Sequence, residues 1–135
     1  MFTLTQTIDA APAEVARAFT EAEPFAAWFL AEGFTTPADR VSIDARPGGL
    51  ISAVFVGDGQ VEVPFTLRFD EVDLPRSVVL HFEEPAEEIT VQLTDLGDGR
   101  TQLDYRSVGL PAEQETTIKP GVATMLGHMA SYFSR

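Results

Sequence analysis

Several features are missing from this 135-residue chain, and each absence excludes a class of function. There is no cysteine, which excludes disulfide bonds, thiolate catalysis and metal sites that need cysteine ligands. No apolar run approaches the ~20 residues that span a bilayer. The N-terminal residues MFTLTQTID have neither the basic region nor the continuous apolar stretch of a signal peptide. The sequence therefore predicts a cytoplasmic protein.

Basic residues are also scarce. Nine Lys and Arg against 21 Asp and Glu give a formal net charge of −12. A field of that sign repels the phosphate backbone of nucleic acids and anionic membrane surfaces. We therefore expect neither nucleic acid nor a membrane as a partner, and solubility is the simplest consequence of the charge.

The residues that are present favour one domain over residues 1–135, because 44% are hydrophobic and no linker or repeat interrupts the chain. It begins with a predicted strand up to about residue 9, followed by two short helices. Pro12 fits the first position of the first helix. Apolar residues at i, i+3, i+4 spacing bury one face of this helix: Val15, Ala18 and Phe19. Pro24 opens the second helix, which carries Phe25, Trp28 and Phe29.

After a predicted loop at residues 30–40, the hydrophobic period changes to two, which is typical of strands. Predicted strands cover residues 41–46, 50–56, 61–70, 78–83, 89–94 and 102–107. Gly57-Asp58-Gly59 and Gly97-Asp98-Gly99 indicate hairpins, because Asp-Gly readily takes the positive φ of tight turns. Pro64 lacks a backbone N–H and indicates an edge position or a bulge.

The last segment returns to a helical period. The predicted helix runs from roughly Pro111 or Thr116 to Phe133, and Pro120 with Gly121 would mark a late start or a kink. Its apolar face contains Ile118, Val122, Met125, Leu126, Met129, Tyr132 and Phe133. A single long amphipathic helix is the natural cover for an antiparallel sheet with one apolar face. The sequence therefore predicts an α+β fold with a space between sheet and helix.

Five motifs occur in an order and spacing that resembles a known family. They are Ala11-Pro12-Ala13-Glu14-Val15 with Ala18-Phe19-Thr20, then Trp28-Phe29, then Arg46-Pro47-Gly48-Gly49, then Gly99 to Tyr105, and finally Gly121 with Met125, Leu126, Met129 and Tyr132. The chain resembles START-like (SRPBCC) helix-grip domains and, among them, the activators of heat-shock protein ninety ATPase and their homologues. The resemblance implies a curved antiparallel sheet of about six or seven strands around a long C-terminal helix, with two short helices after the first strand.

The resemblance also implies a hydrophobic-ligand or stress-related role. The chain departs from the family at three positions: Val122 replaces a frequent tryptophan, Ala11 a usual serine, and Ala16 a frequent aromatic residue. These departures leave the fold intact and put in doubt any ligand inherited from relatives.

The residues predicted to face inward from the sheet include no carboxylate, lysine, arginine or histidine. They are Val61, Val63, Phe65, Leu67, Phe69, Val78, Leu80, Phe82, Ile89, Val91, Leu93, Leu103, Tyr105 and Ser107. A lining of this kind binds apolar molecules and orients them through one or two hydrogen bonds, here from Tyr105 or Ser107. We therefore expect a non-enzymatic ligand-binding domain with no cofactor. The residues expected to line the ligand are Phe25, Trp28, Phe55, Phe65, Leu67, Phe69, Phe82, Tyr105, Met125 and Met129.

The remaining ionisable groups give no sign of a metal site. His81 is predicted on the outer sheet face and His128 at the boundary of the last helix's apolar face. A turn containing Glu83, Glu84, Glu87 and Glu88 is expected to be solvated.

Three alternatives stay open. Trp28, Phe29 and Phe34 either pack in the core or form a gate with the loop at residues 30–40. The protein is either a ligand carrier or an interaction module for a chaperone ATPase. An enzymatic role as a cyclase or hydrolase would depend on Tyr105 or His128. We expect a monomer, or a weak homodimer formed through an apolar edge near Pro64.

Overall fold

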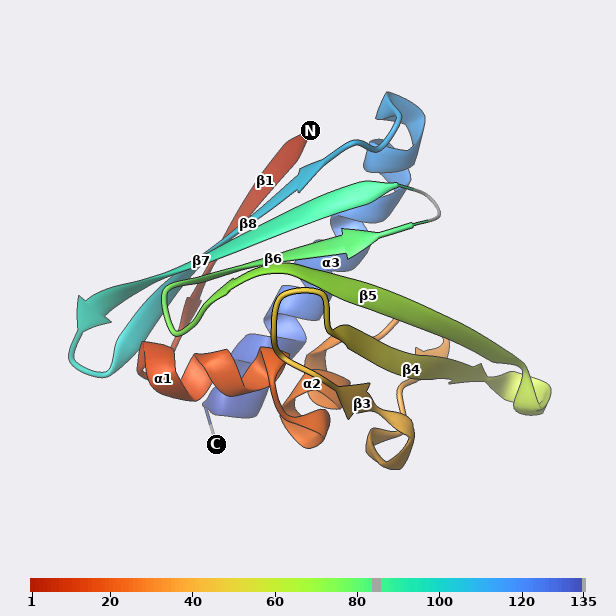
Figure 1. The fold of residues 1–135 in the computed structure, drawn as a ribbon, viewed down its shortest axis with the longest axis horizontal. Helices are drawn as coiled ribbons and strands as arrows, with labels where there is room; N and C mark the ends of the chain where they lie inside the picture. Colours follow the sequence, from red (N-terminus) through yellow and green to blue (C-terminus); the bar gives the residue numbers. More distant parts are fainter. Residues whose placement is uncertain (84–85, 135) are drawn as a thin grey trace.

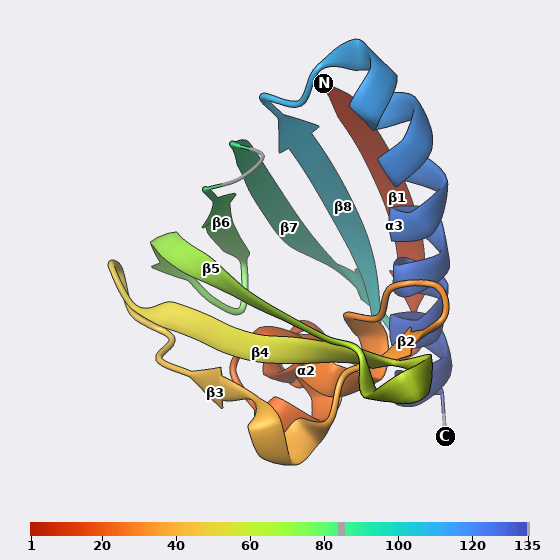
Figure 2. The same ribbon diagram turned by 90° about the vertical axis from the view of Figure 1, so that its right-hand side faces the viewer.

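A computed structural model describes residues 1–83 and 86–134, and in these residues an eight-stranded antiparallel sheet curves around one long helix (Figures 1 and 2). The strands are β1 Phe2–Ile8, β2 Phe34–Thr35, β3 Ser42–Ile43, β4 Leu50–Gly57, β5 Glu62–Asp73, β6 Ser77–Phe82, β7 Glu87–Gly97 and β8 Arg100–Val108. The helices are α1 Pro12–Val15, α2 Ala22–Trp28 and α3 Ala112–Phe133, with 3₁₀ turns η1 Ala16–Phe19, η2 Ala38–Arg40 and η3 Asp58–Gln60. The predicted α+β helix-grip fold is confirmed.

The sheet order is β1-β8-β7-β6-β5-β4-β2, and β3 also pairs with β4. Strands β4 to β8 follow one another as hairpins, so each lies beside its neighbour in sequence. Strand β1 instead pairs along its whole length with β8, from Phe2 opposite Ser107 to Ile8 opposite Thr101. The two small helices that follow β1 are thereby placed beneath the sheet, where they close one end of the grip (Figure 1).

Helix α3 runs across the concave side of the sheet and packs against α2 and β1 (Figure 2). It begins at Ala112, directly after Pro111, and continues through Pro120, so the late start at Thr116 is wrong. Val122, Leu126 and Met129 are its buried residues, at helical spacing of four and three. They join one core cluster with the inner residues of the sheet.

The hairpin formed by β4 and β5 extends beyond the rest of the sheet. Pro64 lies opposite Val54 on β4, whereas the pairing of β5 with β6 begins only at Arg68. Pro64 therefore lies in a segment paired on one side, as its missing N–H predicted. The prediction that Val61 and Val63 face the core is wrong, because they are 53% and 44% exposed. The alternation itself holds from Phe65 to Phe69, but neither α3 nor β6 covers the projecting tip.

A tight turn at residues 46–49 limits β3 to two residues instead of the predicted six-residue strand. Gly48 has φ = +84°, which favours glycine. A Cβ on Gly49 would lie 2.0 Å from the backbone oxygen of Asp44. The Gly48 N–H donates to Phe69 O (2.7 Å) and the Phe69 N–H to Gly49 O (2.9 Å), so the glycine pair fastens this turn to β5.

Candidate functional site

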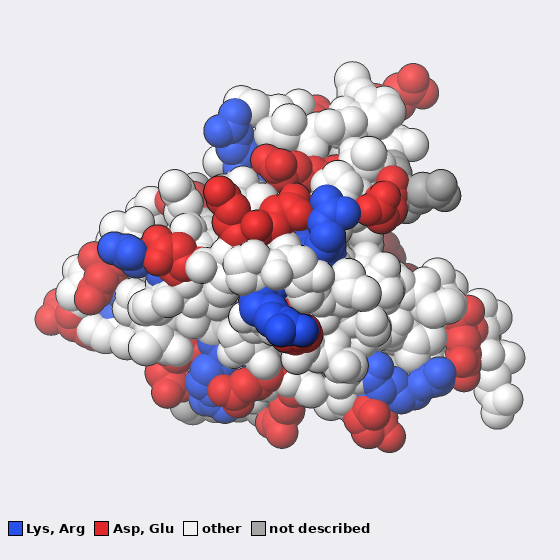
Figure 3. Space-filling view, in the orientation of Figure 1, with Lys and Arg blue, Asp and Glu red and all other residues white. Residues whose placement is uncertain are grey.

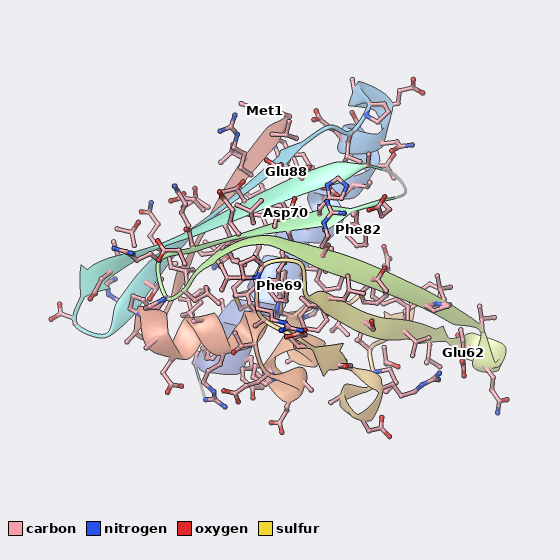
Figure 4. The ribbon with its side chains drawn as sticks, viewed as in Figure 1. Met1, Glu62, Phe69, Asp70, Phe82 and Glu88 are labelled. Carbon is pink, nitrogen blue, oxygen red and sulfur yellow. The ribbon has the colours of Figure 1, made fainter. Side chains whose placement is uncertain are left out.

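Phenylalanine rings from α2 and the sheet meet at one end of the grip. The Phe29 ring is the centre, with centroids 5.0 Å from Phe25, 5.3 Å from Phe65 and 6.3 Å from Phe82. Phe55 stacks on Phe65 at 4.3 Å. Phe25 in this cluster is fully buried, whereas Phe55 on β4, Phe65 on β5 and Phe82 at the end of β6 are half-buried. Figure 4 labels Phe82. Five of the aromatic residues singled out from the sequence are thus brought together.

Trp28 packs beneath this cluster. Its side chain is 1% exposed, its Nε1–H donates to Ala18 O at 2.9 Å, and its ring makes edge contacts with Phe19 and Phe25. These contacts favour core packing over a gate for Trp28. Phe34, the first residue of β2, is only half-buried and borders open space.

That open space is a groove of about 860 Å³ between the loop after α2 and the middle of α3. Its apolar lining comes from Leu30 on the loop, from Phe34 at the start of β2 and from Ile118, Val122 and Met125 on α3. Gly121 also faces it, and a Cβ added there would meet no atom within 4 Å. The volume falls in the range of ordinary small-molecule sites, about 300–1,000 Å³.

Most of the ten residues expected to line a ligand do not lie at this groove. Met125 lines it. Phe55, Phe65 and Phe82 are half-buried in the aromatic cluster. The others are at most 2% exposed and belong to the core: Phe25, Trp28, Leu67, Phe69, Tyr105 and Met129. The sequence did not single out Leu30, because nothing in its pattern shows that the loop turns back onto α3.

Two ionisable side chains, Glu32 and His128, line the groove, and among the described residues no lysine or arginine does. His128 is exposed on α3, at the boundary position that the helical wheel predicts. His81 lies on β6 next to buried Leu80, which places it on the outer sheet face. Within residues 1–83 and 86–134 no three histidine or acidic side chains are grouped closely enough to hold a metal ion.

The prediction that the inner sheet face has no carboxylate is wrong. Glu87, the first residue of β7, is 6% exposed and accepts a 2.6 Å hydrogen bond from Ser107 Oγ on β8. It shares the inner face with Ile89 because the alternation of β7 begins two residues earlier than predicted. The expected solvated turn is therefore only partly observed: Glu83 and Glu88 are exposed, Glu87 is not, and Glu84 lies outside the described residues.

Burial raises the pKa of Glu87 above its ordinary value, and the hydrogen bond from Ser107 partly opposes that rise. Two residues before Ser107, Tyr105 is 2% exposed and stacks on Phe2. Burial raises the pKa of the Tyr105 hydroxyl, and the nearby Glu87 carboxylate raises it further. The inner face thus contains the titratable group that the enzymatic alternative requires, beside the two polar side chains that the sequence indicated.

None of the helices in the described part of the chain is long and apolar enough to cross a bilayer.

Solved structures share this architecture. A protein from Chromobacterium violaceum matches with a TM-score of 0.84 and 24% identity, over 99% of this chain and 97% of the other. The AHSA1 protein from Silicibacter pomeroyi matches with a TM-score of 0.75 and 20% identity, over 98% and 96%. A protein from Nitrosomonas europaea matches with a TM-score of 0.82 and 17% identity, over 96% and 91%. At these identities the likeness concerns the fold.

No curated protein sequence matches the chain. The model of one sequence family, described as activator of Hsp90 ATPase homolog 1-like protein, matches residues 9–134. Because this match covers nearly the whole sequence and agrees with the fold, the chain belongs to the family of activator of Hsp90 ATPase homolog 1-like proteins.

Proposed function

We propose that the protein binds a small, largely apolar molecule in the groove between α3 and the segment that follows α2, without transforming it. The observation that carries this proposal is the groove of about 860 Å³ whose walls are mainly Leu30, Phe34, Ile118, Val122 and Met125. Removing apolar ligand surface from water favours binding by about 25 cal/mol per Å². Met125 adapts its shape easily, which suits a site that accepts related ligands.

Next to the groove, behind Phe34, lie aromatic side chains that are not fully buried. Phe34 lines the groove, its ring lies 6.2 Å from Phe55, and Phe55 stacks on Phe65. These rings offer flat apolar contact surface beside the groove. We therefore favour ligands that contain an aromatic ring over purely aliphatic chains.

Titration with N-phenyl-1-naphthylamine, a neutral dye that becomes fluorescent in apolar surroundings, tests the proposal. Gly121→Phe places a ring in the groove, where a Cβ meets nothing within 4 Å. We expect this variant to weaken dye binding at least about tenfold, or about 1.4 kcal/mol. Gly127→Phe is the matched control, because Gly127 is also on α3, has the same free space at Cβ and does not line the groove. Absence of dye binding, or equal weakening by both variants, contradicts the proposal.

A second candidate function is that of an auxiliary to a chaperone ATPase, which the family description favours. Carboxylates are spread over the outer sheet face, interleaved with a few arginines (Figure 3). Arg68 is paired with Asp70 and Glu83, which leaves other acidic groups, such as the exposed Glu88, to meet a basic surface. Affinity for a purified chaperone ATPase that falls steeply with added salt would support this function. If this protein and the chaperone ATPase sediment separately in a mixture at low salt, this function is excluded.

A further inference from the structure

The groove carries a carboxylate that its apolar walls do not use. Glu32, on the loop after α2, and His128, on α3, line it, and no lysine or arginine does among the described residues. The Glu32 side chain makes no ion pair or hydrogen bond with another residue in the ranges 1–83 and 86–134. A carboxylate without a cationic partner attracts positive charge and repels negative charge. This charge is therefore available to a ligand in the groove.

A tight turn holds Glu32 beside α3, where Figure 2 shows the segment that leads into β2. The Phe34 N–H donates to Ala31 O at 3.0 Å and closes the turn. Gly33 has φ = +82°, the positive value that the second central position of a type II turn takes. The Phe34 ring then lies against Gly57 on β4, because a Cβ on that glycine would be 2.7 Å from Phe34 Cε1. Backbone bonding and ring packing therefore fix the segment that carries the carboxylate.

The threonine side chains of the groove offer acceptors as well. Thr117 and Thr124 both line it. Thr117 Oγ1 donates to Glu113 O at 3.4 Å, and Thr124 Oγ1 donates to Pro120 O at 3.2 Å. Because each hydroxyl hydrogen is used within α3, each oxygen is left to accept a hydrogen bond from a ligand. An ammonium group has three N–H donors and no acceptor, so it fits these oxygens, whereas a carboxylate only accepts.

We propose that the groove selects apolar ligands that bear a protonated amine and disfavours those that bear a carboxylate. The apolar part of the ligand contacts Phe34, Val122 and Met125, and its ammonium group lies beside Glu32. An ion pair in contact with water changes affinity by up to about fivefold. An aromatic ring within about 6 Å of the cation adds to the attraction, and Phe34 lies two residues from Glu32. This selectivity rests on the proposed ligand-binding function and names the class of ligand.

Three ligands of similar shape and different charge test the selectivity: 4-biphenylmethanamine, 4-biphenylmethanol and biphenyl-4-carboxylate. Each competes with N-phenyl-1-naphthylamine for the wild-type protein at about pH 8, where a primary amine is protonated and an ordinary imidazole is neutral. We expect the amine to bind about fivefold more tightly than the alcohol at low salt, and the carboxylate to bind more weakly than the alcohol. At about 1 M salt the first ratio should fall toward one, because the screening length is then about 3 Å. Equal affinities for amine and alcohol at low salt, or preference for the carboxylate, would overturn the proposal.

Substitutions at Glu32 assign the selectivity to this residue. Glu32→Gln should reduce the preference for the amine to about twofold or less, and Glu32→Lys should reverse the order so that the carboxylate binds more tightly than the amine. The same substitutions at Glu88 are the matched controls, because Glu88 is exposed on β7, does not line the groove and gives the same change in net charge (Figure 4). Retained affinity for the alcohol shows that a variant is folded. Equal effects at the two positions would assign the preference to the overall charge of −12 and overturn the proposal.

A second measurement locates the bound ligands without any variant. In wild-type protein labelled with ¹⁵N, the amine and the alcohol should both shift the backbone amide signals of Gly33 and Gly121, which lie on the two walls of the groove. If the dye and all three compounds fail to bind, the ligand-binding function fails and the selectivity fails with it. If the alcohol shifts these signals and the amine binds no more tightly, the selectivity alone is wrong.

Discussion

Replacement of Trp28 by phenylalanine separates the two roles that the sequence left open for this residue. The indole is 1% exposed, and its N–H satisfies the backbone carbonyl of Ala18 at 2.9 Å. Phenylalanine cannot donate, so that carbonyl is left unpaired at a cost of about 1–3 kcal/mol. The smaller ring also loses edge contacts with Phe19 and leaves a void, which adds about 1–2 kcal/mol. We expect a total loss of about 2–4 kcal/mol from the free energy of unfolding.

Urea denaturation followed by far-ultraviolet circular dichroism measures this loss, because the variant removes the single tryptophan and with it the fluorescence signal. Phe34→Leu is the control, since Phe34 is half-buried at the groove and its truncation should cost less than about 1 kcal/mol. If Trp28 acted as a gate, its variant would change dye affinity and leave the urea midpoint near the wild-type value. A loss below about 1 kcal/mol for Trp28→Phe would refute the core assignment.

Four further substitutions have clear expected outcomes. Met129→Ala empties a fully buried site and should cost about 2–4 kcal/mol by urea denaturation followed through tryptophan fluorescence; an unchanged midpoint would contradict the packing of α3. Gly49→Ala should cost more than about 2 kcal/mol in the same assay, because its Cβ meets a backbone oxygen at 2.0 Å, whereas Gly121→Ala should stabilise α3 by up to about 1 kcal/mol. For Glu87 the folded-state pKa is raised, so the folded state binds more protons than the unfolded chain, and stability falls as the pH rises from about 4.5 through the raised pKa. Glu87→Gln should remove that part of the pH dependence, and a wild-type curve that keeps its slope in the variant would show another group to be responsible.

Much of the architecture could be predicted because each element carries its own periodic signal. The Gly-Asp-Gly turns fall where the chain reverses between β4 and β5 and between β7 and β8. The apolar spacing of Val122, Leu126 and Met129 identified the buried face of α3. A short-range pattern cannot show how far a hairpin extends past its neighbours, so it assigned Val63 to the core although nothing covers that position.

The site was predicted less well, for a different reason. A carboxylate at the start of a strand, next to three other acidic residues, resembles a solvated turn, and the partner that allows its burial is a serine 20 positions away. Only the register between β7 and β8 brings Glu87 to Ser107. Extending the alternation of Ile89 and Val91 by one step would have indicated its facing, which is the signal that was available.

The pairing of β1 with β8 also has a consequence for the order in which the chain can fold. Strands β4 to β8 are linked through short turns, so their ladders can form locally and early. β1 can pair only after a strand far along the chain has formed. The hydrogen bond that Thr101 Oγ1 donates to Ala10 O, just after β1, spans 91 positions. During synthesis on the ribosome the N-terminal segment therefore remains without its sheet neighbour until β8 has emerged. Helix α3 follows β8 in the chain and packs against both β1 and α2, so it can close over them only after that strand has emerged.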